Sequence, residues 1–261
     1  MRKNQQREEL AVVLLIDIGN TNVVFAAADG ERIGAPSRLP SKRDMSVQEF
    51  ASALADAFDA DAKWEGAILS SVVAELTDVL AEAAKRVTGH ETFVVEALKT
   101  ELDIRLEDPS QLGADLAVAA IAAKEKYPLP IILFDIGTAD TMSVIGKDGA
   151  FLGGAIMPGP ALAAQSLGAG TSLLPSVTLE APARVIERST EGCIRSGLIH
   201  GHAAMLDGLI ERAEAELGET ATVVGTGGLL SAIAPLCRRE IIRDDALMLE
   251  GLLILYKKTV K

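Results

Sequence analysis

Asp17-Ile18-Gly19-Asn20-Thr21-Asn22 is the stretch from which the fold of this 261-residue chain can be worked out, because it has a counterpart in Asp135-Ile136-Gly137-Thr138-Ala139-Asp140-Thr141. Each stretch follows a short apolar run of strand length and precedes a second apolar run. Each second run then reaches an Asp-Gly pair, which is typical of a hairpin turn. The repeated order of strand, Asp-Ile-Gly turn and strand predicts a duplicated unit.

The segments around these stretches alternate between helical and strand patterns, and this alternation predicts an α/β protein. A boundary near residues 107–111 gives two domains, 1–110 and 111–261. Because no long linker separates the domains, we expect them to pack with a cleft between them. The expected helices are 47–58, 75–87, 112–127 (with Pro109 in its first turn) and 190–217, and the expected short strands are 67–71, 92–95 and 221–224.

The composition limits the class of protein. Hydrophobic residues make up 49% of the chain and charged residues 24%, which excludes disorder as the main state. A net charge of −12 without a basic stripe argues against nucleic acid as a partner. The apolar run 10–16 is cut by Asp17 and is too short to cross a membrane, and two cysteines are too few for a disulfide framework. We therefore expect a soluble cytoplasmic protein with no membrane partner.

The two Asp-Ile-Gly turns carry the strongest chemical signal. An Asp at the end of a buried strand lies at the carboxyl edge of the sheet, where ligands of α/β proteins bind. The Gly and the hydroxyl or amide residues that follow can donate hydrogen bonds to phosphate, whereas the Asp requires a cation such as Mg²⁺ between itself and the phosphate. The alternative is that both carboxylates only cap strand ends.

A third glycine-rich turn follows the expected strand 221–224. Gly225-Thr226-Gly227-Gly228 precedes an expected helix start, where backbone N–H groups favour an anion or the polar edge of a purine. Taken alone this signal is weak, because such turns also arise from packing.

Together these motifs resemble the type III pantothenate kinases. The resemblance implies a duplicated ribonuclease-H-like (actin-like ATPase) fold and the ATP-dependent phosphorylation of pantothenate to 4′-phosphopantothenate, the first step of coenzyme A biosynthesis. It also implies Mg²⁺, a monovalent cation (K⁺ or NH₄⁺) and a homodimer. The matching motifs occur in family order at residues 17–22, 113–115, 135–139, 153–159, 174–175, 189–190, 196–197, 226–228 and 249–252.

The resemblance also implies roles for individual residues. Asp115 would be the general base, Asp135 the ligand of the monovalent cation, and Asp17 a ligand of Mg²⁺ through water. The acceptor pocket would contain Leu106, Gly113, Ala114, Asp115, Leu116 and Thr190. The ATP-binding residues would be Asp17, Ile18, Gly19, Asn20, Thr21, Asn22, Val23, Val24, Gly137, Thr138, Thr226, Gly227 and Gly228.

The residues themselves give a thinner, independent case for Asp115. It falls in the first turns of an expected helix, whose positive end favours the ionised carboxylate that a base must be. Gly113 leaves room for a substrate. Without the resemblance, an Asp at this place would more often be a solvated partner of the helix dipole.

Four positions depart from the family pattern. Leu116 stands where an Arg is expected and Leu106 where a Tyr is expected, and Arg105 or Arg188 are candidates to replace the lost charge. Asp140 replaces a Thr, where it could repel the phosphates, bind the metal or point to solvent, and we expect the last of these. Glu187 replaces a Gly before Thr190. His200 and His202 have no matching acid and histidine set, so we do not expect them to bind metal.

These departures leave two alternatives open. One is a kinase of the same fold that acts on another hydroxy acid, which the changed acceptor pocket favours. The other is a non-catalytic, nucleotide-binding regulatory paralogue, which would bind ATP without phosphorylating any acceptor.

Overall fold

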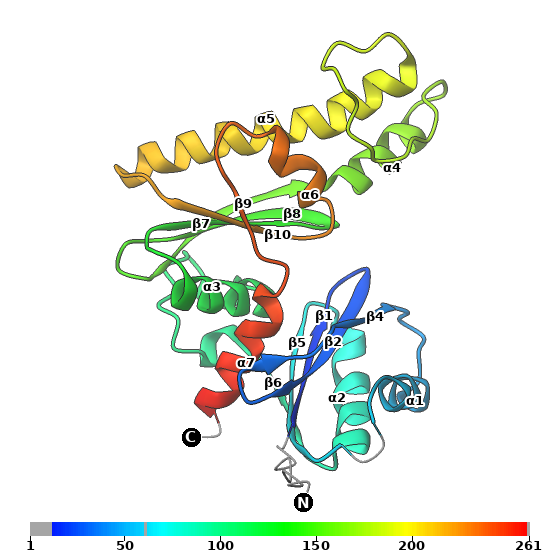
Figure 1. Ribbon diagram of the computed structural model, residues 1–261, viewed down its shortest axis with the longest axis vertical. Coiled ribbons are helices and arrows are strands. Elements are labelled where there is room, and N and C mark those ends of the chain that lie inside the picture. Colours follow the sequence, from blue (N-terminus) through cyan, green and yellow to red (C-terminus); the bar gives the residue numbers. More distant parts are fainter. Residues whose placement is uncertain (1–11, 60–61, 260–261) are drawn as a thin grey trace, which may run out of the picture. The chain divides into compact units, whose positions relative to one another are not determined.

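The computed structural model describes residues 12–59 and 62–259 (Figure 1). The start of the apolar run 10–16, on which the prediction about membranes partly depends, lies outside the described residues. Among the described residues, no helix has the length and apolar character needed to cross a membrane. The chain divides into two compact units: residues 1–101, 110–122 and 246–261 form the first, and residues 102–109 and 123–245 form the second.

The first unit contains a sheet with the strand order β3-β2-β1-β5-β6, in which β4 also pairs with β2. Strands β1 and β2 form an antiparallel hairpin, whereas β1, β5 and β6 run parallel. The strands are β1 (Val12–Ile18), β2 (Asn22–Asp29), β3 (Arg32–Ile33), β4 (Ser37–Pro40), β5 (Trp64–Ser71) and β6 (Thr92–Val94).

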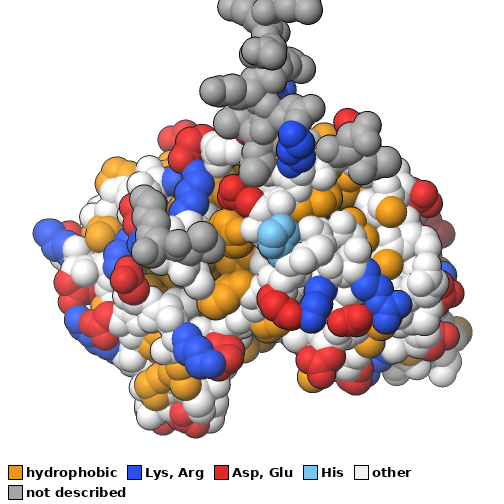
Figure 2. All heavy atoms as spheres, turned by 90° about the horizontal axis from the view of Figure 1, so that it is seen from below, with side chains coloured by type: hydrophobic (Ala, Val, Ile, Leu, Met, Phe, Trp, Pro, Cys, Tyr) orange, Lys and Arg blue, Asp and Glu red, His pale blue; other side chains and the backbone are white. Residues whose placement is uncertain are grey.

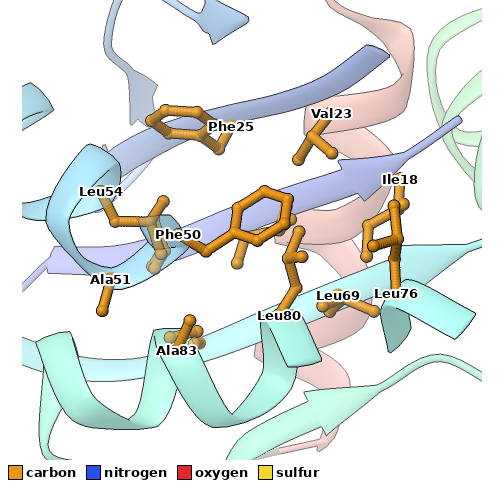
Figure 3. Packing of buried hydrophobic residues seen from close by; sticks show 14 of the residues in the cluster. Ile18, Val23, Phe25, Phe50, Ala51, Leu54, Leu69, Leu76, Leu80 and Ala83 are labelled. Carbon is orange, nitrogen blue, oxygen red and sulfur yellow. The ribbon is translucent and has the colours of Figure 1, made fainter. Parts of the chain in front are cut away.

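Helices α1 (Val47–Ala57) and α2 (Ala74–Thr88) cover one face of this sheet. Figure 3 shows their apolar side chains, Phe50 and Leu80 among them, meeting those of the strands. A capping box starts α1, because Ser46 Oγ accepts from the Glu49 N–H (3.3 Å) and Glu49 Oε2 accepts from the Ser46 N–H (2.8 Å). The predicted helices 47–58 and 75–87 are confirmed to within one residue at each end.

Helix α7 (Leu247–Thr259) packs against β1 and β5, on the opposite side of this sheet from α1 and α2 (Figure 1). The Tyr256 hydroxyl donates to the Glu65 carbonyl at 3.0 Å. A Cβ placed on Gly251 would lie 2.4 Å from the Val118 carbonyl oxygen, so α7 also lies directly against helix α3 (Ala114–Lys126). The end of the chain thus completes the first unit.

The second unit contains a sheet with the strand order β11-β10-β7-β8-β9. Strands β7, β8 and β9 are antiparallel neighbours, whereas β10 and β11 run parallel to β7. Helix α5 lies across one face, where Ile199, Leu206 and Ile210 pack on the strands (Figure 1). The elements are β7 (Ile131–Ile136), β8 (Ala139–Ile145), β9 (Phe151–Pro158), β10 (Thr222–Thr226), β11 (Ile242–Arg243), α4 (Pro160–Gly170), α5 (Thr190–Leu217) and α6 (Leu230–Ile233).

The two sheets repeat one plan. The order β3-β2-β1-β5-β6 in the first corresponds to β9-β8-β7-β10-β11 in the second, with an Asp-Ile-Gly turn after β1 and after β7. The predicted α/β fold with a duplicated unit is confirmed. The contact-based division differs from the expected chain-order domains 1–110 and 111–261, because it groups residues 111–122 and 246–261 with the first sheet. The chain-order boundary remains a prediction.

Three short 3₁₀ helices lie between these elements: η1 (Ala97–Lys99), η2 (Pro109–Gln111) and η3 (Ala234–Leu236). The expectation that Pro109 begins the helix at 112–127 is wrong. Pro109 belongs to the separate turn η2, and α3 begins only at Ala114, after Gly113. On the face seen in Figure 2, Lys and Arg side chains are interspersed with Asp and Glu and form no continuous basic strip among the described residues.

Candidate active-site elements

The first Asp-Ile-Gly turn connects β1 to β2 and is held by neutral hydrogen bonds. The Gly19 N–H donates to the Asn22 carbonyl at 3.0 Å, and Ser41 Oγ donates to the Gly19 carbonyl at 2.6 Å. The Ser41 N–H donates to the Thr21 carbonyl at 3.0 Å. Asn20 and Thr21 are exposed at the tip of the turn. The turn therefore has a fixed shape and two polar side chains at its surface.

Two of the residues predicted to bind ATP at this turn have buried side chains. Ile18 and Val23 lie in the core with α1 and α2, so only their backbone groups are available to a ligand. Side chains alternate between the faces of a strand, so Asp17 lies on the face opposite Ile18, as does Leu15. That is the side of the sheet on which α7 packs.

Asp115 occupies the first turn of α3 and is half-buried. Its Oδ1 accepts a hydrogen bond from the Leu116 N–H at 2.8 Å. A Cβ on Gly113 would lie 2.5 Å from Asp115 Oδ1, so a larger residue there would displace the carboxyl group. Burial raises the pKa of the Asp115 carboxyl group above its ordinary value, against the smaller opposing effect of the backbone N–H groups of Leu116 and Asp115.

The direction of this pKa shift is opposite to the effect expected from the helix N-terminus. We expected the helix N-terminus to favour the ionised carboxylate, but removal from water has the larger effect. A raised pKa strengthens the carboxylate as a proton acceptor, which suits a general base.

The start of α3 lies at the carboxyl end of the first sheet. A Cβ on Gly113 would be 3.9 Å from Val72 Cγ1, and the Val72 N–H donates to the Ile18 carbonyl at 3.1 Å. Asp17 is in register with Ser70 on β5, just before Val72. Asp17 and Asp115 are therefore brought to the same edge of the first unit.

The second Asp-Ile-Gly turn connects β7 to β8 and adjoins the third glycine-rich turn. Asp135 at the end of β7 is in register with Thr226 at the end of β10. Gly227 has a φ of +102°, and a Cβ there would lie 2.3 Å from the Ile136 carbonyl oxygen. Only glycine allows this close approach of the two backbones. Residues from the two predicted ATP-binding stretches of the second unit therefore lie side by side.

The prediction that Asp140 points to solvent is wrong. Its side chain is 0% exposed, and its Oδ1 accepts from the Gly137 N–H at 3.1 Å. Its Oδ2 lies 2.9 Å from Nε2 of His202 on α5, which meets the distance of an ion pair without the alignment of a hydrogen bond. Asp140 raises the pKa of His202, against the opposing effect of burial. Nothing in the sequence pattern marks this partner beyond a histidine on a helix with an apolar face.

The predicted acceptor-pocket residues are divided between the units. Gly113, Ala114, Asp115 and Leu116 belong to the first unit, and Leu106 and Thr190 belong to the second. Thr190 is exposed at the start of α5, where Ser189 Oγ caps the helix by accepting from the Gly192 N–H at 3.1 Å.

Of the two arginines considered as replacements, Arg105 is already engaged, because its guanidinium contacts Asp103 at 2.8 Å and Asp148 at 2.6 Å. Arg188 is exposed just before the helix cap at Ser189.

The carboxylates at the strand ends suit a hydrated cation. Among the described residues, no three His, Cys, Asp or Glu side chains gather as a ready-made metal cage. Asp17 and Asp135 each lie near the end of a strand, beside a glycine turn. Mg²⁺ is commonly bound by one or two carboxylates together with water and substrate phosphates, and this donor set fits that chemistry.

Comparisons with known proteins identify the family. A family model described as type III pantothenate kinase matches residues 13–212. The type III pantothenate kinases of Moorella thermoacetica and Thermomicrobium roseum are each 38% identical to this chain, over 252 and 253 residues. Each alignment covers 95% of this chain, and 99% and 97% of the respective relative.

Solved structures show the same fold at lower identity. A Baf family protein from Campylobacter jejuni has a TM-score of 0.62 at 20% identity and covers 95% of this chain and 98% of its own. An inorganic polyphosphate/ATP-glucomannokinase from Arthrobacter sp. has a TM-score of 0.51 at 15% identity and covers 96% and 98%. The fold is that of the actin-like sugar kinases, and by the extent and identity of the sequence matches the chain belongs to the type III pantothenate kinase family.

Proposed function

We propose that this chain transfers the terminal phosphoryl group of ATP to the primary hydroxyl group of pantothenate, giving 4′-phosphopantothenate, the first step of coenzyme A biosynthesis. The observation that carries the proposal is Asp115, a half-buried carboxyl group with a raised pKa at the carboxyl edge of the first sheet, in a chain of this family. The supporting physical argument is that the side chain is held in place and tuned to accept a proton.

In the proposed reaction, the hydroxyl oxygen of pantothenate attacks the γ-phosphorus of ATP as its proton passes to Asp115. The bond from that phosphorus to the β–γ bridging oxygen breaks, and ADP leaves. The Leu116 N–H fixes Oδ1 of Asp115 and so orients the carboxyl group (2.8 Å). Phosphoryl transfer depends mainly on positioning and charge neutralisation, so a well-oriented base and rigid phosphate-binding turns are sufficient protein groups.

ATP would be bound by the three glycine turns. Backbone and polar groups of 17–24 and 137–138 would face the phosphates, and residues 226–228 would lie near the adenosine. Asp17 would hold Mg²⁺ through water, and Asp135 would hold K⁺ or NH₄⁺. When bound, these cations supply positive charge that offsets the charge of the phosphates.

One observation supports a second candidate for the acceptor. Leu106 and Leu116 are apolar where the family pattern has groups that suit pantothenate, and Arg105 is occupied by Asp103 and Asp148. This observation favours, as a second candidate, a kinase of the same fold acting on another hydroxy acid.

We also propose that the chain forms a homodimer. Large apolar side chains are exposed in the second unit, with exposed fractions of 77% for Ile156, 91% for Leu173 and 83% for Ile186. Exposed apolar surface of this kind is typical of protein interfaces. Size-exclusion chromatography with light scattering tests the oligomeric state.

The test of function is ADP release from ATP with Mg²⁺ and K⁺, with and without pantothenate, together with mass detection of phosphopantothenate. We expect pantothenate-dependent turnover, and a fall in kcat of about 100-fold or more in Asp115→Asn, because the amide cannot take the proton. Asp78→Asn, an exposed carboxylate on α2, is the matched control and should behave as wild type. Pantothenate-independent turnover, or full activity in Asp115→Asn, would contradict the proposal. Turnover with another hydroxy acid alone would support the second candidate.

A further inference from the structure

Asp140 and His202 form a buried polar pair that the proposed mechanism does not use. Asp140 is 0% exposed and His202 is 8% exposed, and the two side chains approach to 2.9 Å. Burying a carboxyl group without a partner costs several kcal/mol. Asp140 and His202 reduce this cost because each side chain is the polar partner of the other. An apolar core at this place would avoid that cost, which raises the question of what the pair does.

The contacts of the pair lead to the β7–β8 turn. Oδ1 of Asp140 accepts from the Gly137 N–H at 3.1 Å, so the carboxyl group fixes one backbone group of the turn. His202 lies on α5, and its Nε2 is 2.9 Å from Oδ2 of Asp140. The pair therefore links the turn to α5.

The neighbouring backbone leaves little freedom for this turn. The Gly159 N–H donates to the Thr138 carbonyl at 3.1 Å. A Cβ on Gly159 would lie 2.2 Å from the Gly137 carbonyl oxygen and 3.0 Å from Asp140 Oδ1. The turn is thus packed between the end of β9 and the Asp140 carboxyl group, and its shape depends on where that carboxyl group stands.

We propose that Asp140 and His202 act as one positioning unit that holds the β7–β8 turn in the shape that binds the phosphates of ATP. This inference rests on the proposed function in one respect, namely that the turn binds ATP. Both are positioning residues, since they act through Gly137 and need not touch the nucleotide.

The pair also has a defined response to pH. Asp140 raises the pKa of His202, so the ring is protonated to a higher pH than a free histidine. The stabilisation from this interaction is complete below the ordinary pKa of 6.5 and is lost as the pH rises through the raised value. The affinity for ATP should therefore fall as the pH rises through the raised pKa of His202.

Few other charged groups act on the pair. In the described structure, β9 and α4 carry no charged side chain, and β7 contributes Asp135 at its end. After η3, Cys237 Sγ donates to the Ala203 carbonyl at 3.8 Å, and burial raises its pKa to about 11, so it stays neutral over the range of the test. Asp207 on α5 accepts from the Arg238 N–H at 2.9 Å. His202 is thus the group expected to titrate here.

The test measures nucleotide binding directly, by isothermal titration calorimetry with Mg²⁺ and the non-hydrolysable analogue AMP-PNP. The variants are Asp140→Asn, His202→Gln and the double variant, with His200→Gln as the matched control. His200 lies on the same helix, but its ring contacts the Pro182 carbonyl (3.0 Å). Thermal melting confirms that each variant is folded at the temperature of the titration.

We expect each single variant to bind AMP-PNP about tenfold more weakly at pH 7, and the double variant to be no weaker than the weaker single variant. At saturating ATP, kcat should change less than about twofold, since the base is untouched. Between pH 7 and 9, where phosphate groups are already ionised, the affinity of the wild type should fall while that of the variants stays level. The His200→Gln control should match the wild type.

Three results would overturn the inference. They are wild-type affinity in a folded His202→Gln, single effects that multiply in the double variant, and a wild-type affinity that does not change with pH. If Asp140→Asn fails to fold, the affinity of His202→Gln for AMP-PNP and the pH dependence of the wild-type affinity still test the inference. AMP-PNP binding without phosphorylation of pantothenate would reject the proposed function and leave the positioning test intact, whereas no AMP-PNP binding by the wild type would reject both.

Discussion

The two Asp-Ile-Gly turns share a sequence and a place in their sheets, yet they are supported by different chemistry. The β1–β2 turn is held by neutral groups, with Ser41 Oγ on the Gly19 carbonyl at 2.6 Å. The β7–β8 turn is held by a buried carboxyl group on the Gly137 N–H and by a histidine behind it. The two sheets thus share the turn while the contacts described around it differ, and those around the second turn include a group that can titrate.

A second difference lies on the strand beside each turn. In the first unit Ser71 ends β5, where its Oγ accepts from the Val73 N–H at 3.1 Å and from the Thr77 hydroxyl at 2.8 Å. The corresponding place after β10 is Gly227, which has a positive φ and contacts the Ile136 backbone. One unit uses a side chain to fix the start of a helix, and the other uses the absence of a side chain to let two backbones meet.

The largest effect on stability is expected at these two strand ends, Gly227 and Ser71. Gly227→Ala should lower the free energy of unfolding by about 3 kcal/mol, because its Cβ would lie 2.3 Å from the Ile136 carbonyl oxygen at a φ of +102°. Ser71→Gly should cost about 1 kcal/mol, through the lost hydrogen bonds. Urea denaturation measures both.

Gly228→Ala is the matched control, since a Cβ there would meet nothing within 4 Å and its φ is not positive. Gly228→Ala should leave the free energy of unfolding nearly unchanged. If Gly227→Ala were as stable as Gly228→Ala, the two strand ends would not differ in the way described.

The sequence predicts those parts of this comparison that depend on local patterns. The Asp-Ile-Gly turns, the strands around them and the start of α1 at its capping box all follow from adjacent residues. The family resemblance further marks Asp115, which the structure places beside Gly113 at the carboxyl edge of the first sheet.

The supports of the turns could not be predicted, because they are long-range contacts. His202 reaches Asp140 only when α5 packs on the second sheet, and Ser41 reaches Gly19 only when β4 pairs with β2. Likewise the raised pKa of Asp115 arises from burial, which depends on tertiary packing. Each of these features was missed or expected in the opposite sense for the same physical reason.

A moderate effect is expected from removing the Ser41 hydroxyl group, which supports the β1–β2 turn. Ser41→Ala removes the hydrogen bond to the Gly19 carbonyl and should cost about 1 kcal/mol of unfolding free energy, with a severalfold rise in the KM for ATP. This rise should be the same at pH 7 and pH 9, because a hydroxyl group does not titrate in that range. Initial rates at varied ATP measure it, and Ser52→Ala on the exposed side of α1 is the control. A pH-dependent effect of Ser41→Ala would remove the distinction between the two supports.

The smallest effect is expected at Arg105, and it tests whether this side chain supplies the charge that binds the acceptor. Its guanidinium contacts Asp103 at 2.8 Å and Asp148 at 2.6 Å, all three side chains are about half exposed, and exposed ion pairs contribute little to stability. Arg105→Ala should therefore change the KM for pantothenate less than about twofold, as should Arg43→Ala, an exposed arginine of the first unit that contacts Glu75 at 3.0 Å. A rise of about tenfold in Arg105→Ala alone, equivalent to one strong contact, would instead mean that this side chain leaves its two carboxylates to bind the acceptor.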